Sequence, residues 1–166
     1  MIGVILLCVS LFVPADTMWD EVTGDTTILP AQMRDFKVRV IDCSSGFTGS
    51  AICEPGVFIS GVSGRRSYAL AFIAPSESYF MPVKEVYLRI DNEVYTVSDE
   101  ESSMKETVML CAVNLTTEGL FRQVMEARSL KAKIYIYGDE YISIDVTPKL
   151  EKIKEFFRQY EKGGAR

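Results

Sequence analysis

The segment 133–146 constrains the fold more than any other, because it joins two alternating runs through a Gly-Asp turn at 138–139. This pattern predicts a β-hairpin whose arms are long enough to nucleate a sheet. Successive side chains of a strand point to opposite sides, so the aliphatic residues of both arms share one face. We expect that face in the core. The other face, with Tyr135, Tyr137 and Tyr141, is available to meet a partner.

A second hairpin is predicted over Glu85–Val97, with its turn at Asp91-Asn92-Glu93. In its first arm the aliphatic residues are expected to face inward, and Tyr87 and Arg89 outward. Other runs rich in apolar and β-branched residues predict four further strands. These strands are expected at 36–41, 56–62, 67–74 and 107–113.

Two helices are predicted from apolar residues that recur with the helical period. The first covers Thr117–Ser129, with Glu118 in its first turn and Arg128 in its last, as the helix dipole favours. The second covers Pro148–Lys162, where Thr147 precedes a proline at the first helical position. Its apolar stripe is typical of a helix that packs on a sheet rather than of a partner peptide.

These elements predict a mainly β (α+β) fold. We expect an antiparallel sandwich or a bent sheet with two helices, the C-terminal one packed on the sheet. With 166 residues, the chain has the length of one domain with a sizeable core. Residues 35–166 are expected to form this single β-rich domain, after a flexible lead-in segment at 16–34.

The first residues of the chain predict export. Residues 2–13 are an apolar run followed by Pro14 and Ala15, and the run is shorter than the roughly 20 residues that cross a bilayer. It is typical of a signal peptide over residues 1–15 with cleavage after Ala15, although no Lys or Arg precedes it. A periplasmic or secreted protein is therefore expected. The alternative is a buried first strand of a cytosolic domain.

Cysteine spacing also favours an exported protein. Cys43 and Cys53 bracket a segment rich in Gly and Ser that can fold back on itself, so a disulfide between them is predicted. The alternative is two unpaired thiols. Cys111 lies within an apolar run and is expected to be a buried thiol.

Composition weakens the case for several functions. The formal net charge of −5 repels phosphate backbones, so nucleic-acid binding is not expected. The chain has no histidine, which removes the commonest general base and the commonest metal ligand. The acidic run Asp99-Glu100-Glu101 lacks the spaced ligands of a calcium loop and predicts a solvated loop. We therefore expect no enzyme activity, no catalytic residue, no metal and no small-molecule cofactor.

A binding surface is the remaining candidate for function. If the two hairpins lie in one sheet, their outward residues share one face, and Tyr and Arg dominate the binding energy of protein interfaces. The alternative is that a helix or a second sheet covers the tyrosines. The candidate binding residues are Tyr87, Arg89, Tyr95, Tyr135, Tyr137 and Tyr141.

The predicted function follows from this surface. We expect a non-enzymatic accessory protein that binds another envelope or secreted protein through its tyrosine-bearing sheet face. One alternative is an inhibitor or immunity-type protein that blocks an enzyme, with the acidic loop 98–101 as the intruding element. Another is an enzyme that uses carboxylates or tyrosine without histidine.

The C-terminal half carries a family resemblance. A set of bacterial envelope proteins resembles this half in three successive parts: Val86–Val97 with its strand VYLRID, the first predicted helix, and the later SLKAKIYIYGDEYISIDV at 129–146. The named relatives of this pattern are the invasion-associated locus B family and accessory proteins of type VI secretion. The resemblance implies a secreted or periplasmic β-sandwich with a non-catalytic role, and it carries over no functional residue.

Overall fold

The computed structural model describes residues 13–44, 47, 49–75, 83–98, 101–105, 108–136 and 140–161, with the backbone alone for 101–105. Within these ranges eleven strands form one sheet, accompanied by two α-helices and two short 3-10 helices. The strands are β1 (Ala15–Trp19), β2 (Thr26–Pro30), β3 (Lys37–Cys43), β4 (Ser50–Ile59), β5 (Arg66–Pro75), β6 (Val83–Ile90), β7 (Glu93–Val97), β8 (Glu101–Lys105), β9 (Val108–Asn114), β10 (Leu130–Ile136) and β11 (Tyr141–Asp145). The helices are η1 (Met33–Phe36), α1 (Phe121–Glu126), η2 (Thr147–Lys149) and α2 (Leu150–Glu161).

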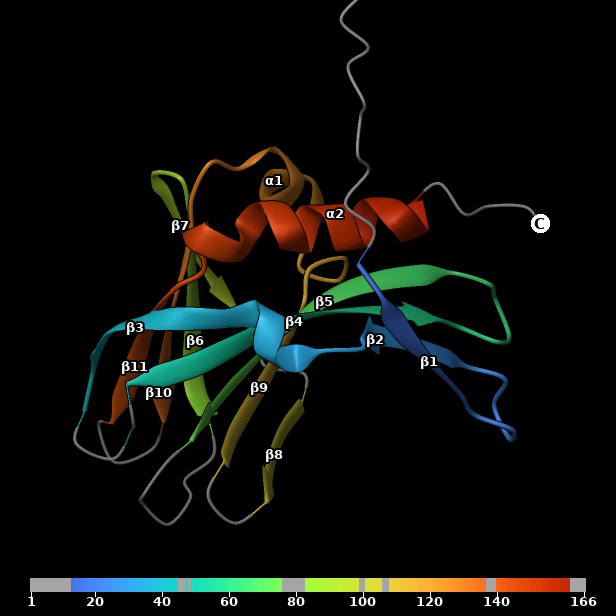
Figure 1. Ribbon diagram of the computed structural model, residues 1–166, viewed down its shortest axis with the longest axis horizontal. Coiled ribbons are helices and arrows are strands. Elements are labelled where there is room, and N and C mark those ends of the chain that lie inside the picture. The colour runs from blue at the N-terminus through green and yellow to red at the C-terminus, as the bar shows by residue number, and fades with distance from the viewer. Residues whose placement is uncertain are drawn as a thin grey trace, which may run out of the picture.

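The sheet is antiparallel, bent and not closed. Its strand order is β7-β6-β10-β11-β3-β4-β5-β9-β8. Two strands pair with the same edge of β4: β3 pairs with its first residues and β2 with its last. β2 in turn pairs with β1. Figure 1 shows the sheet curving beneath α2, with β8 and β9 reaching away from the helix. The predicted mainly β fold is confirmed, in the form of a single bent sheet.

The core lies between the inner face of the sheet and α2. In β10 the residues Leu130, Ala132, Ile134 and Ile136 are buried and alternate with more exposed ones. The same alternation in β5, β6, β9 and β11 gives the sheet one continuous apolar face. The buried residues of sheet and helices form one hydrophobic cluster. Burial of these alternating side chains explains why the period-two pattern predicted the strands correctly.

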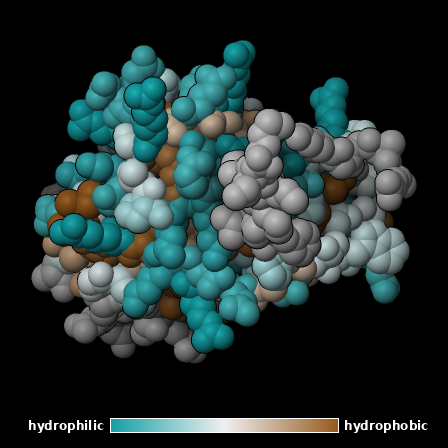
Figure 2. Space-filling view, turned by 45° about the horizontal axis from the view of Figure 1, so that its top comes forward, coloured by the Kyte–Doolittle hydropathy of each residue, from teal (hydrophilic) through white to brown (hydrophobic). Residues whose placement is uncertain are grey.

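Helix α2 is held on the sheet by aromatic and polar contacts. The ring of Phe157 meets the rings of Tyr68 and Phe121 edge-on, with centroids 5.5 Å apart in both pairs. The buried Lys154 ammonium donates hydrogen bonds to the Ala127 carbonyl at 2.5 Å and to Glu151 Oε1 at 2.7 Å, which connects α2 to the end of α1. The prediction that the C-terminal helix packs on the sheet is confirmed. Figure 2 shows the helix side of the molecule as largely hydrophilic, with separate brown patches.

The segment predicted as a flexible lead-in, residues 16–34, instead contains most of β1, all of β2 and the start of η1. Asp20 Oδ1 accepts hydrogen bonds from the backbone N–H groups of Val22 and Thr23, and Gly24 completes the turn with φ of +72°. Most residues of β1 are exposed, so the apolar alternation that identifies a strand is missing there. The hairpin depends on its turn and on pairing with β4.

The first predicted helix is shorter than expected, and begins only at Phe121. Asn114 Oδ1 accepts hydrogen bonds from the N–H groups of Thr116 and Thr117, and Gly119 adopts φ of +70°. These local side-chain bonds and the left-handed glycine stabilise a turn in place of the first helical turns.

The predicted disulfide between Cys43 and Cys53 is not present, and both cysteines are free. The β3–β4 register places Arg39 opposite Ser50, so the two cysteines lie on opposite sides of this pair along the strands. Seven residue positions then separate them, a distance of roughly 20 Å along a strand. A disulfide requires Cα atoms within about 7 Å of each other. Cys53 and Cys111 are both fully buried, and burial raises the pKa of the Cys53 thiol well above its usual range.

Most of the predicted signal peptide lies outside the described residues, which begin at Val13. Val13 is buried in the core, and β1 begins at Ala15, the residue before the expected cleavage point. Among the described residues, no helix is both long enough and apolar enough to span a bilayer.

Asp91 connects the β6–β7 turn to the segment before β10. Its backbone is left-handed, with φ of +51°. Its Oδ1 accepts hydrogen bonds from the N–H groups of Arg128 at 2.9 Å and Ser129 at 2.8 Å. These hydrogen bonds, that from Arg128 first, hold the pKa of the Asp91 carboxyl below its usual value.

We therefore expect Asp91→Asn to flatten the dependence of stability on acid pH. A carboxyl whose pKa is lower in the folded than in the unfolded state stabilises the fold above the unfolded-state pKa, and this contribution is lost as the pH falls through the folded-state pKa. Below about pH 4 the free energy of unfolding of the wild type should therefore fall more steeply than that of Asp91→Asn. Urea unfolding at a series of acid pH values measures this, and parallel curves for the two proteins would contradict the assignment.

Candidate functional site

Four of the six predicted binding residues lie on one surface, the outer face of β6, β10, β11 and β3. They are Tyr87, Arg89, Tyr135 and Tyr141. Directly opposite residues in neighbouring strands point to the same side of a sheet. One such row runs Tyr87, Lys133, Ser143, Asp42, and the next runs Arg89, Lys131, Asp145, Arg39. A third row joins Glu85, Tyr135 and Tyr141. We call the surface formed by Tyr87, Tyr135, Tyr141, Arg89, Lys131, Lys133, Asp42 and Glu85 the tyrosine face.

Two of the predicted binding residues, Tyr95 and Tyr137, are not among those that the structure places on the tyrosine face. Tyr95 is the cross-strand partner of the buried Leu88, so it lies on the inner side and packs partly against the core. The expected three-residue turn is in fact a two-residue turn, because Ile90 pairs directly with Glu93. This shift of one residue turns every side chain of β7 to the other face of the sheet. Tyr137 lies outside the described residues.

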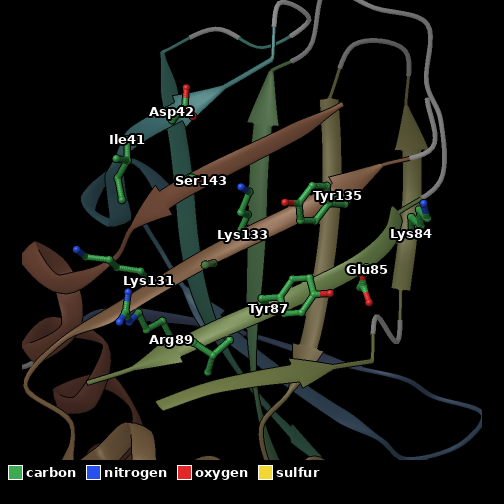
Figure 3. Close-up of a pocket in the computed structure, with 12 residues that line it drawn as sticks. Ile41, Asp42, Lys84, Glu85, Tyr87, Arg89, Lys131, Lys133, Tyr135 and Ser143 are labelled. Atoms are coloured by element: carbon green, nitrogen blue, oxygen red, sulfur yellow. The ribbon is translucent and has the colours of Figure 1, made fainter. Parts of the chain in front are cut away.

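The tyrosine face contains an open depression with a volume of about 760 Å³. Figure 3 shows Tyr87 and Tyr135 rising from neighbouring strands on one side of it, and Arg89 and Lys131 on the other. Lys84, Ile41 and Val94 extend its lining. The helices pack against the opposite, inner face of the sheet, so they leave this face uncovered.

The three tyrosine rings and Lys133 contact one another. The Tyr87 and Tyr135 rings meet edge-on with centroids 6.0 Å apart, and the centroids of Tyr135 and Tyr141 are 5.9 Å apart. The Lys133 ammonium lies 5.0 Å from the Tyr135 ring centroid and 4.4 Å from that of Tyr141. The Tyr141 hydroxyl donates a hydrogen bond to Asp42 Oδ2 at 2.7 Å. These contacts restrict the side chains before any partner binds.

The pKa directions on the tyrosine face favour binding over chemistry. The hydrogen bond with Tyr135 raises the pKa of Lys133. Hydrogen bonds to Glu85 and to Asp42 raise the pKa values of Tyr87 and Tyr141 respectively. The lysine is therefore held charged and the phenols are held neutral at pH 7. A nucleophilic lysine or a tyrosine base requires shifts in the other direction.

Replacing Asp42 with asparagine should lower the pKa of the Tyr141 phenol toward its usual value. The charged acceptor that stabilises the protonated phenol is then absent. A pH titration of the Tyr141 ring resonances by NMR measures the change. Glu85→Gln is the matched variant, because it should lower the pKa of Tyr87 and leave that of Tyr141 in place. An unchanged Tyr141 titration in Asp42→Asn would show that this hydrogen bond does not form in solution.

The depression is locally basic on an acidic protein. Four cationic residues, Lys84, Arg89, Lys131 and Lys133, line it against two carboxylates, Asp42 and Glu85. The whole chain has a net charge of −5. The sequence reasoning missed the two lysines of β10. Because they alternate with the buried residues in step with Tyr135, the same period-two pattern assigns them to the outer face.

A second open depression of about 780 Å³ lies beside β1, β2 and β4. Its lining includes the exposed side chains of Met18, Trp19 and Phe58. The sequence did not indicate this surface. Among the described residues, no group of three cysteines or carboxylates is placed to hold a metal ion.

Comparison with known protein families, with curated proteins and with solved structures gives no match for this chain.

Proposed function

We propose that this chain is a non-enzymatic, exported accessory protein that binds another envelope or secreted protein through the tyrosine face. The observation that carries the proposal is the outer face of the neighbouring strands β6 and β10, which the helices leave open and on which tyrosines and cations gather. Tyrosine buries a large area while keeping a polar group, and with arginine it is enriched among residues that dominate interface energy. A periplasmic or secreted location rests on the apolar run at residues 2–13.

The arrangement supports binding for two further reasons. The depression is open to solvent rather than a closed pocket of the kind that encloses a small molecule. Its tyrosine rings are already packed on one another, so ordering them on binding loses little conformational entropy.

The test is affinity capture from the envelope fraction of the native host. The bait proteins are the wild type, Tyr87→Ala/Tyr135→Ala, and Trp19→Ala as a matched control that removes an exposed aromatic residue of the second depression. The wild type and Trp19→Ala should retain the same partner, and the double variant should lose it while remaining folded. A partner that the folded double variant still retains would contradict the proposal.

The same captured complex separates the two binding hypotheses. A partner enzyme whose activity falls on one-to-one association would support the inhibitor alternative. A partner without such a loss supports the accessory role. The measured mass of the mature chain reports whether residues 1–15 are removed.

A further inference from the structure

On the tyrosine face, two cationic side chains lie directly opposite each other on neighbouring strands. Arg89 and Lys131 are cross-strand partners in β6 and β10, and Figure 3 shows their side chains on the same side of the sheet. Like charges at directly opposite positions destabilise a sheet. Both side chains are exposed, and within the described residues neither forms an ion pair. Within the described part of the chain, no ion pair therefore offsets this repulsion.

The nearest carboxylates on the face have other partners. Asp145 is the cross-strand neighbour of Lys131 on β11, but its Oδ1 accepts a hydrogen bond from the backbone N–H of Thr147 at 3.1 Å. Asp42 accepts the hydrogen bond of the Tyr141 hydroxyl. Both carboxylates keep their charge, but among the described residues neither forms an ion pair with Arg89 or Lys131, so both cations can bind an anion supplied from outside.

A third cation repeats along the same strand. Lys133 follows Lys131 by two residues, so both point outward, about 6.6 Å apart along β10. Alternate side chains of an extended peptide have the same spacing. Tyr87 lies directly opposite Lys133, and Tyr135 follows on β10, so aromatic surface flanks the charges.

We propose that the partner presents an extended acidic segment with carboxylates at alternate positions, one bound between Arg89 and Lys131 and the next beside Lys133. The inference rests on the proposed function and names the chemistry of the partner. Arginine binds carboxylates through two parallel hydrogen bonds, which favours a carboxylate at Arg89. The flanking tyrosine rings pack on the aliphatic parts of the segment.

The small extent of the basic area favours a short acidic segment over an extended polyanion. A chain of net charge −5 repels nucleic acid and anionic membrane outside a small basic area. The described cations of this depression lie on two strands, β6 and β10, and do not extend into a stripe along the molecule. An acidic segment of a protein fits an area of this size.

The test titrates the full chain with two synthetic peptides, Ser-Glu-Ser-Glu-Ser-Glu-Ser and its counterpart with Gln at every Glu. Affinity is measured by NMR chemical-shift changes at low salt. We expect the Glu peptide to bind at least tenfold more tightly than the Gln peptide, with binding that weakens as salt is added. Arg89→Gln and Lys131→Gln should each weaken binding at least tenfold. Arg65→Gln, which removes an exposed arginine at another place, should bind as the wild type does.

The charge-reversal variant Arg89→Glu gives a second test, with stability and peptide binding as its two readouts. It places a carboxylate opposite Lys131, so the unfolding midpoint should rise while peptide binding is lost. A fall in stability together with unchanged binding would overturn the inference. So would absence of peptide binding to the wild type, or preferred binding to anionic vesicles or single-stranded nucleic acid.

The outcomes separate this inference from the proposed function. If capture of the partner depends on Tyr87 and Tyr135 but not on Arg89 and Lys131, the inference of an acidic segment is wrong and the proposed function still holds. Capture that depends on none of them overturns both.

Discussion

Replacing Phe157 with alanine is expected to lower the free energy of unfolding by about 3–5 kcal/mol, the usual result of truncating a fully buried phenylalanine. The ring is completely buried and contacts Tyr68 from β5 and Phe121 from α1. Its removal leaves a cavity where the sheet and both helices meet. Urea unfolding monitored by circular dichroism measures the loss.

The matched control in the same helix is Glu161→Ala, an exposed residue at the end of α2. Its effect should stay within about 0.5 kcal/mol, as for most surface substitutions. Equal effects of the two variants would mean that α2 does not pack on the sheet as described.

The second large effect is a difference in stability loss between substitutions at two neighbouring residues of β10, Ile134 and Tyr135. Ile134→Ala should lower the free energy of unfolding by about 2–5 kcal/mol, because Ile134 is fully buried on the inner face of β10. Tyr135→Ala should lower it by less than about 1.5 kcal/mol, because Tyr135 lies on the outer face and loses mainly its contacts with Tyr87 and Tyr141.

This pair decides whether the tyrosine face is open. Unfolding of both variants under the same conditions gives the comparison directly. A loss for Tyr135→Ala as large as that for Ile134→Ala would assign the tyrosine to a core and remove the surface on which the proposed function depends.

Regular burial made part of the fold predictable. In β10, in β11 and in β6 from Val86 onward, every second residue is buried. This alternation in the sequence located the strands and the outward side of Tyr87, Arg89, Tyr135 and Tyr141. The apolar stripe of α2 likewise located the C-terminal helix and the side that packs on the sheet. The same rule places Lys131 and Lys133 on the outer face, because they alternate with the buried Leu130, Ala132 and Ile134.

Other features depend on quantities that a local pattern does not contain. The length of a turn decides which side of the sheet the side chains of the next strand point to. The β6–β7 turn has two residues rather than the expected three, so Tyr95 lies on the inner side. Register, not separation along the chain, decides whether Cys43 reaches Cys53. β1 buries few of its own side chains, so it leaves little apolar periodicity to detect.

The central claim, that the tyrosine face is where a protein partner binds, is tested most directly by photo-cross-linking in the native host. A photoreactive benzoylphenylalanine replaces the half-buried Tyr87 in one variant and the exposed Trp19 in another, which places two probes in different surface depressions. Our account predicts one discrete adduct from position 87 and none from position 19. An adduct from position 19 with none from position 87 would contradict it.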